Sequence, residues 1–195
     1  LGEKINGGNY SSRILVTLAW GYDGEVPGNS GILPNGVIPE ELVKAIRETR
    51  HQVFWLLRLH PVQLRNKFLY RRHIRLVNDL VEKNSNTESD ISSNCELRTI
   101  LGHCNGHITM SSNTSYEAAY MGVPTLLLCP TLDSGQVNED LFADLREEGF
   151  ADLEINAEAR EIVDWCLKSN RKAGKSYGEG ADDWGQLVDW MLGKE

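Results

Sequence analysis

The sequence predicts a single Rossmann-like α/β domain with a mostly parallel sheet and helices on both faces. Short apolar stretches of strand length alternate with amphipathic stretches of helix length almost throughout the chain. The apolar stretches are continuous rather than alternating, which is typical of strands buried on both faces of a sheet. A chain of 195 residues is long enough for one such domain with a proper core.

The N-terminal part of the chain supplies two predicted strands. Residues 1–12 are rich in Gly, Asn and Ser and are expected to be a linker or a frayed end, so the domain is expected to cover the rest of the chain, from the first strand to residue 195. That strand is the apolar run 13–20, and a Gly- and Pro-rich loop follows at 21–36 that is long enough to indicate a functional loop. A helix is predicted over 39–50, with proline at a favourable first position, and the second strand over 52–59.

The middle of the chain is mixed in character. Basic and apolar residues alternate irregularly after the second strand, which predicts a helix near 62–70 and a strand at 73–77. A polar, turn-like stretch comes next. The following helix is predicted over 95–104, with Ser92 or Ser93 as its cap.

The C-terminal part resumes the alternation of strands and helices. The expected elements are strand 107–110, helix 116–121, strand 125–128, helix 140–148, edge strand 151–155, helix 157–169 and helix 182–192. Gly122 and Gly149 are expected to end the helices that precede them. The last two helices are expected to pack across the domain.

Composition excludes several classes of protein. A net charge of −8 argues against a general nucleic-acid binder and against docking on anionic lipid, although it leaves room for a local basic pocket. Six cations cluster in the sequence around one candidate site: Arg58, Arg65, Lys67, Arg71, Arg72 and Arg75. No apolar run reaches transmembrane length and no signal peptide is visible, so we expect no direct membrane insertion.

The first residue and the cysteines indicate the origin of the chain and its redox environment. The chain begins with Leu1 and not Met, so we expect a fragment of a longer protein or a processed product. The four cysteines are scattered without a C-x-x-C pair, which favours free thiols in a reducing cytosol.

Three unusual loops are expected at the carboxyl ends of the strands, where open α/β sheets bind ligands. They are the Gly-rich loop that begins at Gly21, the dipeptide His60-Pro61, and the polar turn after the strand that starts near His107. Because three separate segments meet at one edge, we expect a binding site there.

The polar turn carries the strongest signal for a phosphate site. Five hydrogen-bonding residues stand where a strand gives way to a helix: Ser111, Ser112, Asn113, Thr114 and Ser115. Free N–H groups and the positive end of a helix dipole converge at such a point. Glu117 follows about half a turn later, where an acid can reach ribose hydroxyls. The alternatives are that the serines only cap the helix and that Glu117 only complements its dipole.

The second candidate group is Arg58 with His60. Side chains two apart on a strand point to one face, so both are expected to hold phosphate, and His60 is also expected to protonate a departing phosphate. The alternative is that His60 merely caps a strand. The other histidines share no metal-ligand spacing, and the chain has no G-x-S-x-G, no P-loop and no G-x-G-x-x-G.

These residues resemble a known superfamily. The segment from Ser111-Ser112 through Glu117-Ala-Ala to Gly122-Val-Pro124 is similar to the serine-pair, Glu-Ala and Gly-x-Pro segment in the C-terminal, nucleotide-binding half of GT-B glycosyltransferases. Arg58-Leu-His60-Pro61 resembles the His-Pro motif of bacterial sialyltransferases, Kdo transferases and CDP-glycerol transferases, which use CMP- or CDP-activated donors.

The resemblance implies a donor site and an absent acceptor domain. His60 is implied as the catalytic group, and the donor and phosphate contacts as Gly21, Arg58, Pro61, Ser111, Ser112, Asn113 and Ser115. Glu117 is implied to bind the ribose. Only one of the two GT-B domains fits this length, so the N-terminal acceptor domain and the catalytic base are expected to be missing and the isolated chain inactive.

The function implied is transfer of a sugar from a CMP-, CDP- or UDP-activated donor to a polysaccharide or glycolipid acceptor, without metal or other cofactor. The expected location is the cytoplasm, with the missing half as the route to the inner face of the membrane. The alternatives are a sugar-nucleotide epimerase or a glycerophosphotransferase of the same fold, a non-catalytic nucleotide- or sugar-binding module, and a structural domain whose polar turn is only a cap.

Overall fold

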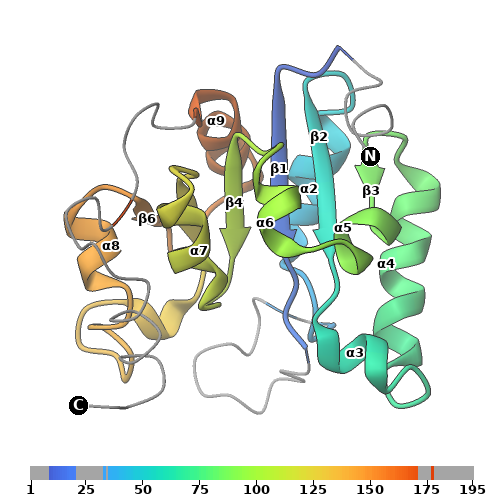
Figure 1. Ribbon diagram of the computed structural model, residues 1–195, viewed down its shortest axis with the longest axis horizontal. Coiled ribbons are helices and arrows are strands. Elements are labelled where there is room, and N and C mark those ends of the chain that lie inside the picture. The colour runs from blue at the N-terminus through green and yellow to red at the C-terminus, as the bar shows by residue number, and fades with distance from the viewer. Residues whose placement is uncertain (1–8, 21–32, 34, 171–176, 178–195) are drawn as a thin grey trace.

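The computed structural model describes residues 9–20, 33, 35–170 and 177, and within them all strands form one parallel sheet (Figure 1). The strand order is β3-β2-β1-β4-β5-β6. The strands are β1 (Ser12–Thr17), β2 (Val53–Arg58), β3 (Thr87–Glu88), β4 (Gly106–Thr109), β5 (Thr125–Leu127) and β6 (Ala151–Leu153). The helices are α2 (Glu40–Glu48), α3 (Pro61–Arg65), α4 (Arg71–Lys83), α5 (Asp90–Asn94), α6 (Leu97–Leu101), α7 (Thr114–Tyr120), α8 (Ala143–Glu147) and α9 (Ala159–Lys168), with a 3₁₀ turn at Pro130–Leu132.

The central strands are buried on both faces, as their continuous apolar sequence predicts. In β1, Ile14 and Val16 join one core while Leu15 joins the other, because successive side chains of a strand point to opposite faces. In β2, Trp55 joins the first core and Leu56 the second.

Helices cover both faces of the sheet. Figure 1 shows α5, α6 and α7 in front of the strands and α2 and α9 behind them. The front core includes Ile100 from α6 and Ala118 from α7, and the rear core includes Leu42 from α2 and Ile162 from α9. The predicted fold class, a Rossmann-like domain with helices on both faces, is confirmed. No helix within the described ranges has the length and apolar character needed to span a bilayer.

The prediction of a strand at 73–77 is wrong, because these residues lie inside the helix α4. The short run His73-Ile-Arg-Leu-Val77 reads as a strand when taken alone. In the longer sequence, Ile74, Val77 and Val81 recur three and four residues apart, which is the spacing of one helix face. Val77 is buried in the rear core and Ile74 packs against it, so the helical period wins.

The predicted serine cap is also wrong. The polar stretch before 95–104 holds the edge strand β3 and the short helix α5, and Ser92 and Ser93 lie within α5 rather than at the start of the next helix. The hydroxyl of Ser92 donates to the carbonyl oxygen of Leu57 at 3.0 Å. The hydroxyl oxygen of Ser93 accepts from the N–H of Leu59 at 3.0 Å. Both serines tie α5 to the end of β2.

Other predictions agree with the structure within a few residues. β1 begins at Ser12, one residue before the predicted start of the strand. The Tyr10 ring lies 5.1 Å from that of Phe54, so part of the predicted N-terminal linker packs against the domain. Gly122 and Gly149 have φ of 68° and 71°, the left-handed conformation expected where a helix stops. All four cysteines are free thiols. The predicted helix 182–192 and most of the loop 21–36 lie outside the described residues.

Replacing Gly106 with alanine is expected to lower the free energy of unfolding by about 1–3 kcal/mol, because the new methyl group overpacks the rear core. A Cβ at this position would lie 3.0 Å from two ring atoms of Trp165 and 3.1 Å from Cδ1 of Ile14. Urea denaturation measures the loss. Combining Gly106→Ala with Trp165→Leu should recover part of the lost free energy of unfolding. If the losses of the two single variants simply add in the double variant, the methyl group does not clash with the indole ring.

Candidate functional site

The strand order reverses between β1 and β4, and the connections that follow these strands leave in opposite directions. After β1 the chain continues to α2 behind the sheet, and after β4 it continues to α7 in front of it (Figure 1). The two connections therefore diverge beyond the carboxyl ends of β1 and β4, and we call this position the crevice, the term used for the switch point of an open α/β sheet. Such a switch point is the usual ligand position in an open α/β sheet.

The polar turn lies on one side of this crevice. Its bonds hold it tightly: the N–H and the hydroxyl of Ser115 both donate to the carbonyl oxygen of Ser112, at 3.0 and 2.8 Å. The N–H of Thr114 donates to the hydroxyl oxygen of Ser112 at 3.3 Å. Within the described residues, the N–H groups of Ser111, Ser112 and Asn113 have no hydrogen-bond partner. Three successive unpaired N–H groups can bind an anion.

The turn differs from the sequence-based expectation in two ways. Helix α7 has only seven residues, so its unpaired N–H groups offer more to an anion than its macrodipole would. The Ser115 side chain is fully buried and its hydroxyl is used within the turn, so it shapes the turn, whereas Ser111 and Ser112 are half-buried and Asn113 is exposed.

His60 lies at the same edge, two residues beyond β2 and at the start of α3. Its Nδ1 accepts from the N–H of Val62 at 3.2 Å, and its own N–H donates to Oε1 of Gln63 at 2.8 Å, which together cap α3. The ring stacks on Trp20, with 5.3 Å between centroids and 20° between planes. His60 therefore has a capping role, but at the start of helix α3 and not at the end of a strand as the alternative had it, and this role occupies only one ring nitrogen.

This geometry leaves His60 as a neutral hydrogen-bond donor. Because Nδ1 accepts a bond, the proton of the neutral ring is assigned to Nε2, which has no partner among the described residues. Burial lowers the pKa of His60 below its ordinary value, and nearby Arg65 lowers it further. The ring is therefore neutral near pH 7 until an anion binds and raises its pKa.

His60 and the polar turn are brought to one edge on either side of β1. β2 and β4 both pair with β1, so their axes lie about 10 Å apart at this edge. The His60 ring and the polar turn therefore flank the same ligand position beyond the end of β1.

Arg58 is held elsewhere. Its Nη1 donates to the carbonyl oxygens of Ser92 and Cys95, the latter at 2.9 Å, so it caps the carboxyl end of α5. The strand ends at Arg58, and the two-residue alternation therefore does not extend to His60. Its role in phosphate binding stays a prediction.

Glu117 is half-buried on α7 at the front of the crevice. Burial raises the pKa of its carboxyl, and the positive charges of Arg98 and Arg58 partly offset this effect. A carboxylate kept within reach of two cations but exposed on one side suits hydrogen bonding to a ribose diol. Pro61 is the exposed first residue of α3, and Gly21 lies outside the described residues.

Sequence reasoning missed a buried network beneath the turn. Nε2 of His107 lies 2.9 Å from the Thr17 hydroxyl oxygen and 3.3 Å from that of Thr114, and Nδ1 lies 3.1 Å from that of Thr125. The imidazole thus links β1, β5 and the first residue of α7. Burial lowers the pKa of His107 to about 3, so the ring is neutral. One signal was available: each of these residues interrupts an apolar strand or opens a helix.

Within the described ranges, no three or more His, Cys, Asp or Glu side chains gather where they could hold a metal ion.

Comparisons with known proteins agree with the fold. No protein-family model and no curated protein matches the sequence. Among solved structures, the UDP-GlcNAc 2-epimerase from Methanocaldococcus jannaschii superimposes with a TM-score of 0.54 at 16% identity, over 97% of this chain and 49% of that one. The wall teichoic acid polymerase TagF superimposes with a TM-score of 0.50 at 15% identity, over 98% and 46%.

The chain therefore spans about half the length of these two proteins. At this identity the likeness shows the fold alone. It supports the predicted architecture, a Rossmann-like domain that corresponds to one half of a GT-B fold. The finer resemblance to CMP-sugar transferases stays a prediction.

Proposed function

We propose that this chain is the donor-binding part of an enzyme that acts on a nucleotide-activated sugar, and that the enzyme is a glycosyltransferase. The observation that carries the proposal is that two groups of hydrogen-bond donors lie at the same edge of the sheet, where the strand order reverses. The turn at Ser111–Asn113 offers unpaired N–H groups, and His60 offers an N–H from the other side of β1. Both are donors suited to the oxygens of one diphosphate.

In this scheme the pyrophosphate lies across the end of β1. The turn binds one phosphate through backbone N–H groups, and Nε2–H of His60 binds the other. As the bond from sugar carbon to phosphate oxygen breaks, negative charge grows on the leaving phosphate. Donors already in place stabilise that charge, and His60 becomes the more easily protonated as the charge grows. The scheme calls for no metal.

The ribose and the acceptor complete the proposal. Glu117 accepts hydrogen bonds from the ribose hydroxyls. The acceptor is a polysaccharide or glycolipid, and a second domain supplies its site and the catalytic base. Epimerase and glycerophosphotransferase reactions remain alternatives on the same fold, and analysis of the products from a radiolabelled donor separates the three.

Calorimetric titration with CMP, CDP, UDP and GDP tests the site. We expect micromolar to millimolar binding with a preference for a cytidine nucleotide, weakened about tenfold in His60→Ala through loss of a hydrogen bond to a charged phosphate. Arg160 is an exposed residue of α9, behind the sheet, and Arg160→Gln serves as the control. If none of the four nucleotides binds, only a structural role for the polar turn remains.

Glu117→Gln separates ribose from phosphate recognition. We expect it to weaken binding of the preferred nucleoside diphosphate about tenfold while leaving inorganic pyrophosphate affinity unchanged, because the carboxylate contacts only the sugar. His60→Ala should weaken both ligands. An equal loss of nucleotide and pyrophosphate in Glu117→Gln would contradict the ribose role.

A further inference from the structure

The turn between α3 and α4 presents two adjacent apolar side chains to solvent. Phe68 is 83% exposed and Leu69 is 71% exposed. The turn is well held: Nη1 of Arg71 donates to the carbonyl oxygen of Phe68 at 3.1 Å, and the guanidinium carbon lies 4.8 Å from the centre of the Phe68 ring. The N–H of Tyr70 donates to the carbonyl oxygen of Asn66 at 3.1 Å. The fold therefore fixes these apolar groups in an exposed position.

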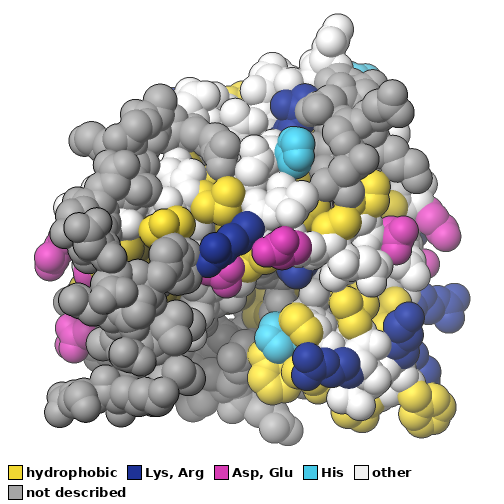
Figure 2. Space-filling view, in the orientation of Figure 1, with side chains coloured by type: hydrophobic (Ala, Val, Ile, Leu, Met, Phe, Trp, Pro, Cys, Tyr) yellow, Lys and Arg dark blue, Asp and Glu magenta, His cyan; other side chains and the backbone are white. Residues whose placement is uncertain are grey.

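Positive charge surrounds this pair. Between Glu48 and Asp79 the chain has no acidic residue and seven basic ones, although its net charge is −8. Five of them flank Phe68 and Leu69, are all exposed and form no ion pair within the described residues: Arg65, Lys67, Arg71, Arg72 and Arg75. We call these seven residues the α3–α4 tip. Figure 2 shows Lys and Arg side chains gathered with hydrophobic ones at the lower right, over α3 and the start of α4.

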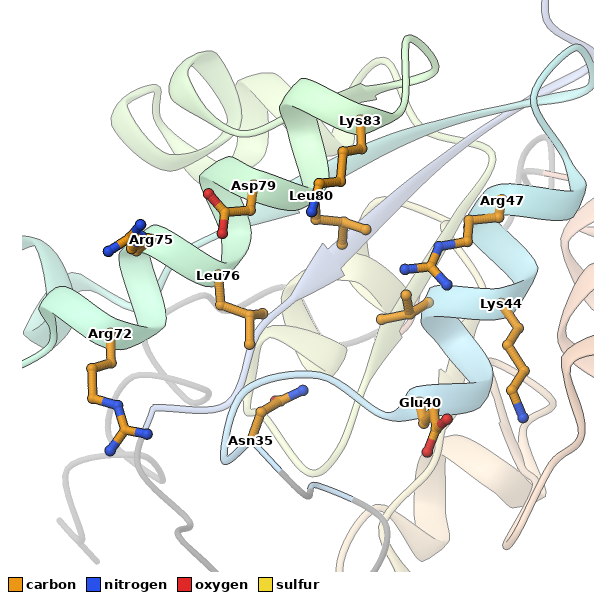
Figure 3. Close-up of a pocket in the computed structure, with 11 residues that line it drawn as sticks. Asn35, Glu40, Lys44, Arg47, Arg72, Arg75, Leu76, Asp79, Leu80 and Lys83 are labelled. Carbon is orange, nitrogen blue, oxygen red and sulfur yellow. The ribbon is translucent and has the colours of Figure 1, made fainter.

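A groove between α2 and α4 extends the basic surface. It encloses about 620 Å³, and Arg72 and Arg75 of the tip line it together with Arg47 (Figure 3). In Figure 3, Leu76 and Leu80 point from α4 toward α2. The groove therefore combines an apolar floor with a rim of five cations and two carboxylates, Glu40 and Asp79, so its net charge has the same sign as that of the tip.

We propose that the α3–α4 tip docks this domain on an anionic phospholipid bilayer, with Phe68 and Leu69 inserted among the headgroups and the surrounding cations facing lipid phosphates. An apolar pair within a basic surface is what interfacial docking needs. Two protruding side chains are far less than the roughly 800 Å² per partner that a stable protein interface buries. The overall negative charge does not prevent docking, because charges more than about 8–10 Å away are screened.

The proposal revises the expectation, drawn from net charge, that the chain avoids anionic lipid. It also has a consequence that rests on the proposed function. Helix α3 begins directly after His60, so docking through its far end would hold the donor crevice near the membrane surface. An acceptor carried on a lipid would then reach the crevice without leaving the bilayer.

Vesicle co-sedimentation tests the proposal with the whole chain. We expect binding to vesicles of phosphatidylcholine with phosphatidylglycerol in a ratio of about three to one and little binding to pure phosphatidylcholine. Phe68→Ser with Leu69→Ser should lower the partition coefficient more than tenfold. Lys67→Gln with Arg72→Gln should lower it about fivefold per cation.

Matched controls use residues of similar exposure elsewhere. Val137 is 85% exposed, and Val137→Ser should bind vesicles normally, as should Arg160→Gln with Lys168→Gln on α9. The tip variants should keep wild-type affinity for nucleotide, so loss of docking is distinguishable from loss of the donor site. No binding to the anionic vesicles, or equal binding by Phe68→Ser with Leu69→Ser, overturns the proposal. Self-association that this double variant abolishes, in a protein that ignores vesicles, would also overturn it and identify the tip as an interface between copies.

Discussion

Replacing His107 with leucine is expected to lower the free energy of unfolding by about 2–5 kcal/mol, because it removes the bonds of the buried ring and leaves the Thr125 hydroxyl without a partner, while Thr17 and Thr114 keep only their 3.3 Å contact with each other. His107 is fully buried, and its two ring nitrogens lie within hydrogen-bond distance of Thr17, Thr114 and Thr125. Leucine has a similar volume, so a cavity contributes little to the loss. Denaturation with urea, followed by circular dichroism, measures it.

The same variant should disturb the donor site. Thr114 is the first residue of α7 and follows the polar turn directly, so the His107 bond helps fix the turn relative to β1. We expect His107→Leu to weaken nucleotide binding several-fold at a temperature where the variant is still folded. Thr125→Val removes only the bond farthest from α7 and serves as the comparison. Equal nucleotide affinities in His107→Leu and the wild type would show that the turn holds its position without this network.

The second large effect is a decrease in the free energy of unfolding at acidic pH that is caused by protonation of His107. Its pKa is about 3 in the folded protein and about 6.5 in an unfolded chain. Between these values the unfolded chain binds a proton that the folded protein does not. The contribution is therefore fully present above pH 6.5 and is lost as the pH falls toward 3, at up to about 1.4 kcal/mol per pH unit.

Other groups titrate in this range, so the test is a difference between two proteins. Burial raises the pKa values of Glu88 and Glu117, and this works in the opposite direction because the folded protein holds those protons more tightly. Subtracting the stability of His107→Gln from that of the wild type at each pH cancels such terms. We expect the difference to shrink steadily from pH 6.5 to 4. A difference that is independent of pH would mean that the buried ring is protonated in the folded state.

Much of the fold was predictable because the pattern of apolar residues along the chain indicates which segments are buried strands. Runs such as Val53–Leu57 are buried on both faces, and only a parallel sheet between helix layers accommodates several of them. Residues 73–77 taken alone match a strand, because the helical period shows only over a window of more than ten residues. The edge strand β3 could not be predicted, because Thr87 and Glu88 form a two-residue strand by pairing with Trp55 and Leu56, which local sequence does not record.

The position of the candidate residues at one edge of the sheet was predictable, but their contacts were less so. Strand ends in a parallel sheet share an edge, so His60 and the turn at Ser111 follow from topology. Arg58 was expected beside His60, but it binds carbonyl oxygens of α5, an element that the sequence did not reveal. The His107 network depends on register: β4 pairs His107 with Leu15 on one side and Thr125 on the other, so their side chains share the face that α7 covers.

The most direct test of the account is to locate the phosphates of a bound nucleotide by NMR. CDP or UDP is titrated into ¹⁵N-labelled protein while the backbone amides of Ser111, Ser112 and Asn113 and the imidazole of His60 are followed. We predict that both groups shift together with one dissociation constant, because one diphosphate contacts both sides of β1. Shifts confined to the groove between α2 and α4, with the amides of the turn and the His60 ring unchanged, would contradict it.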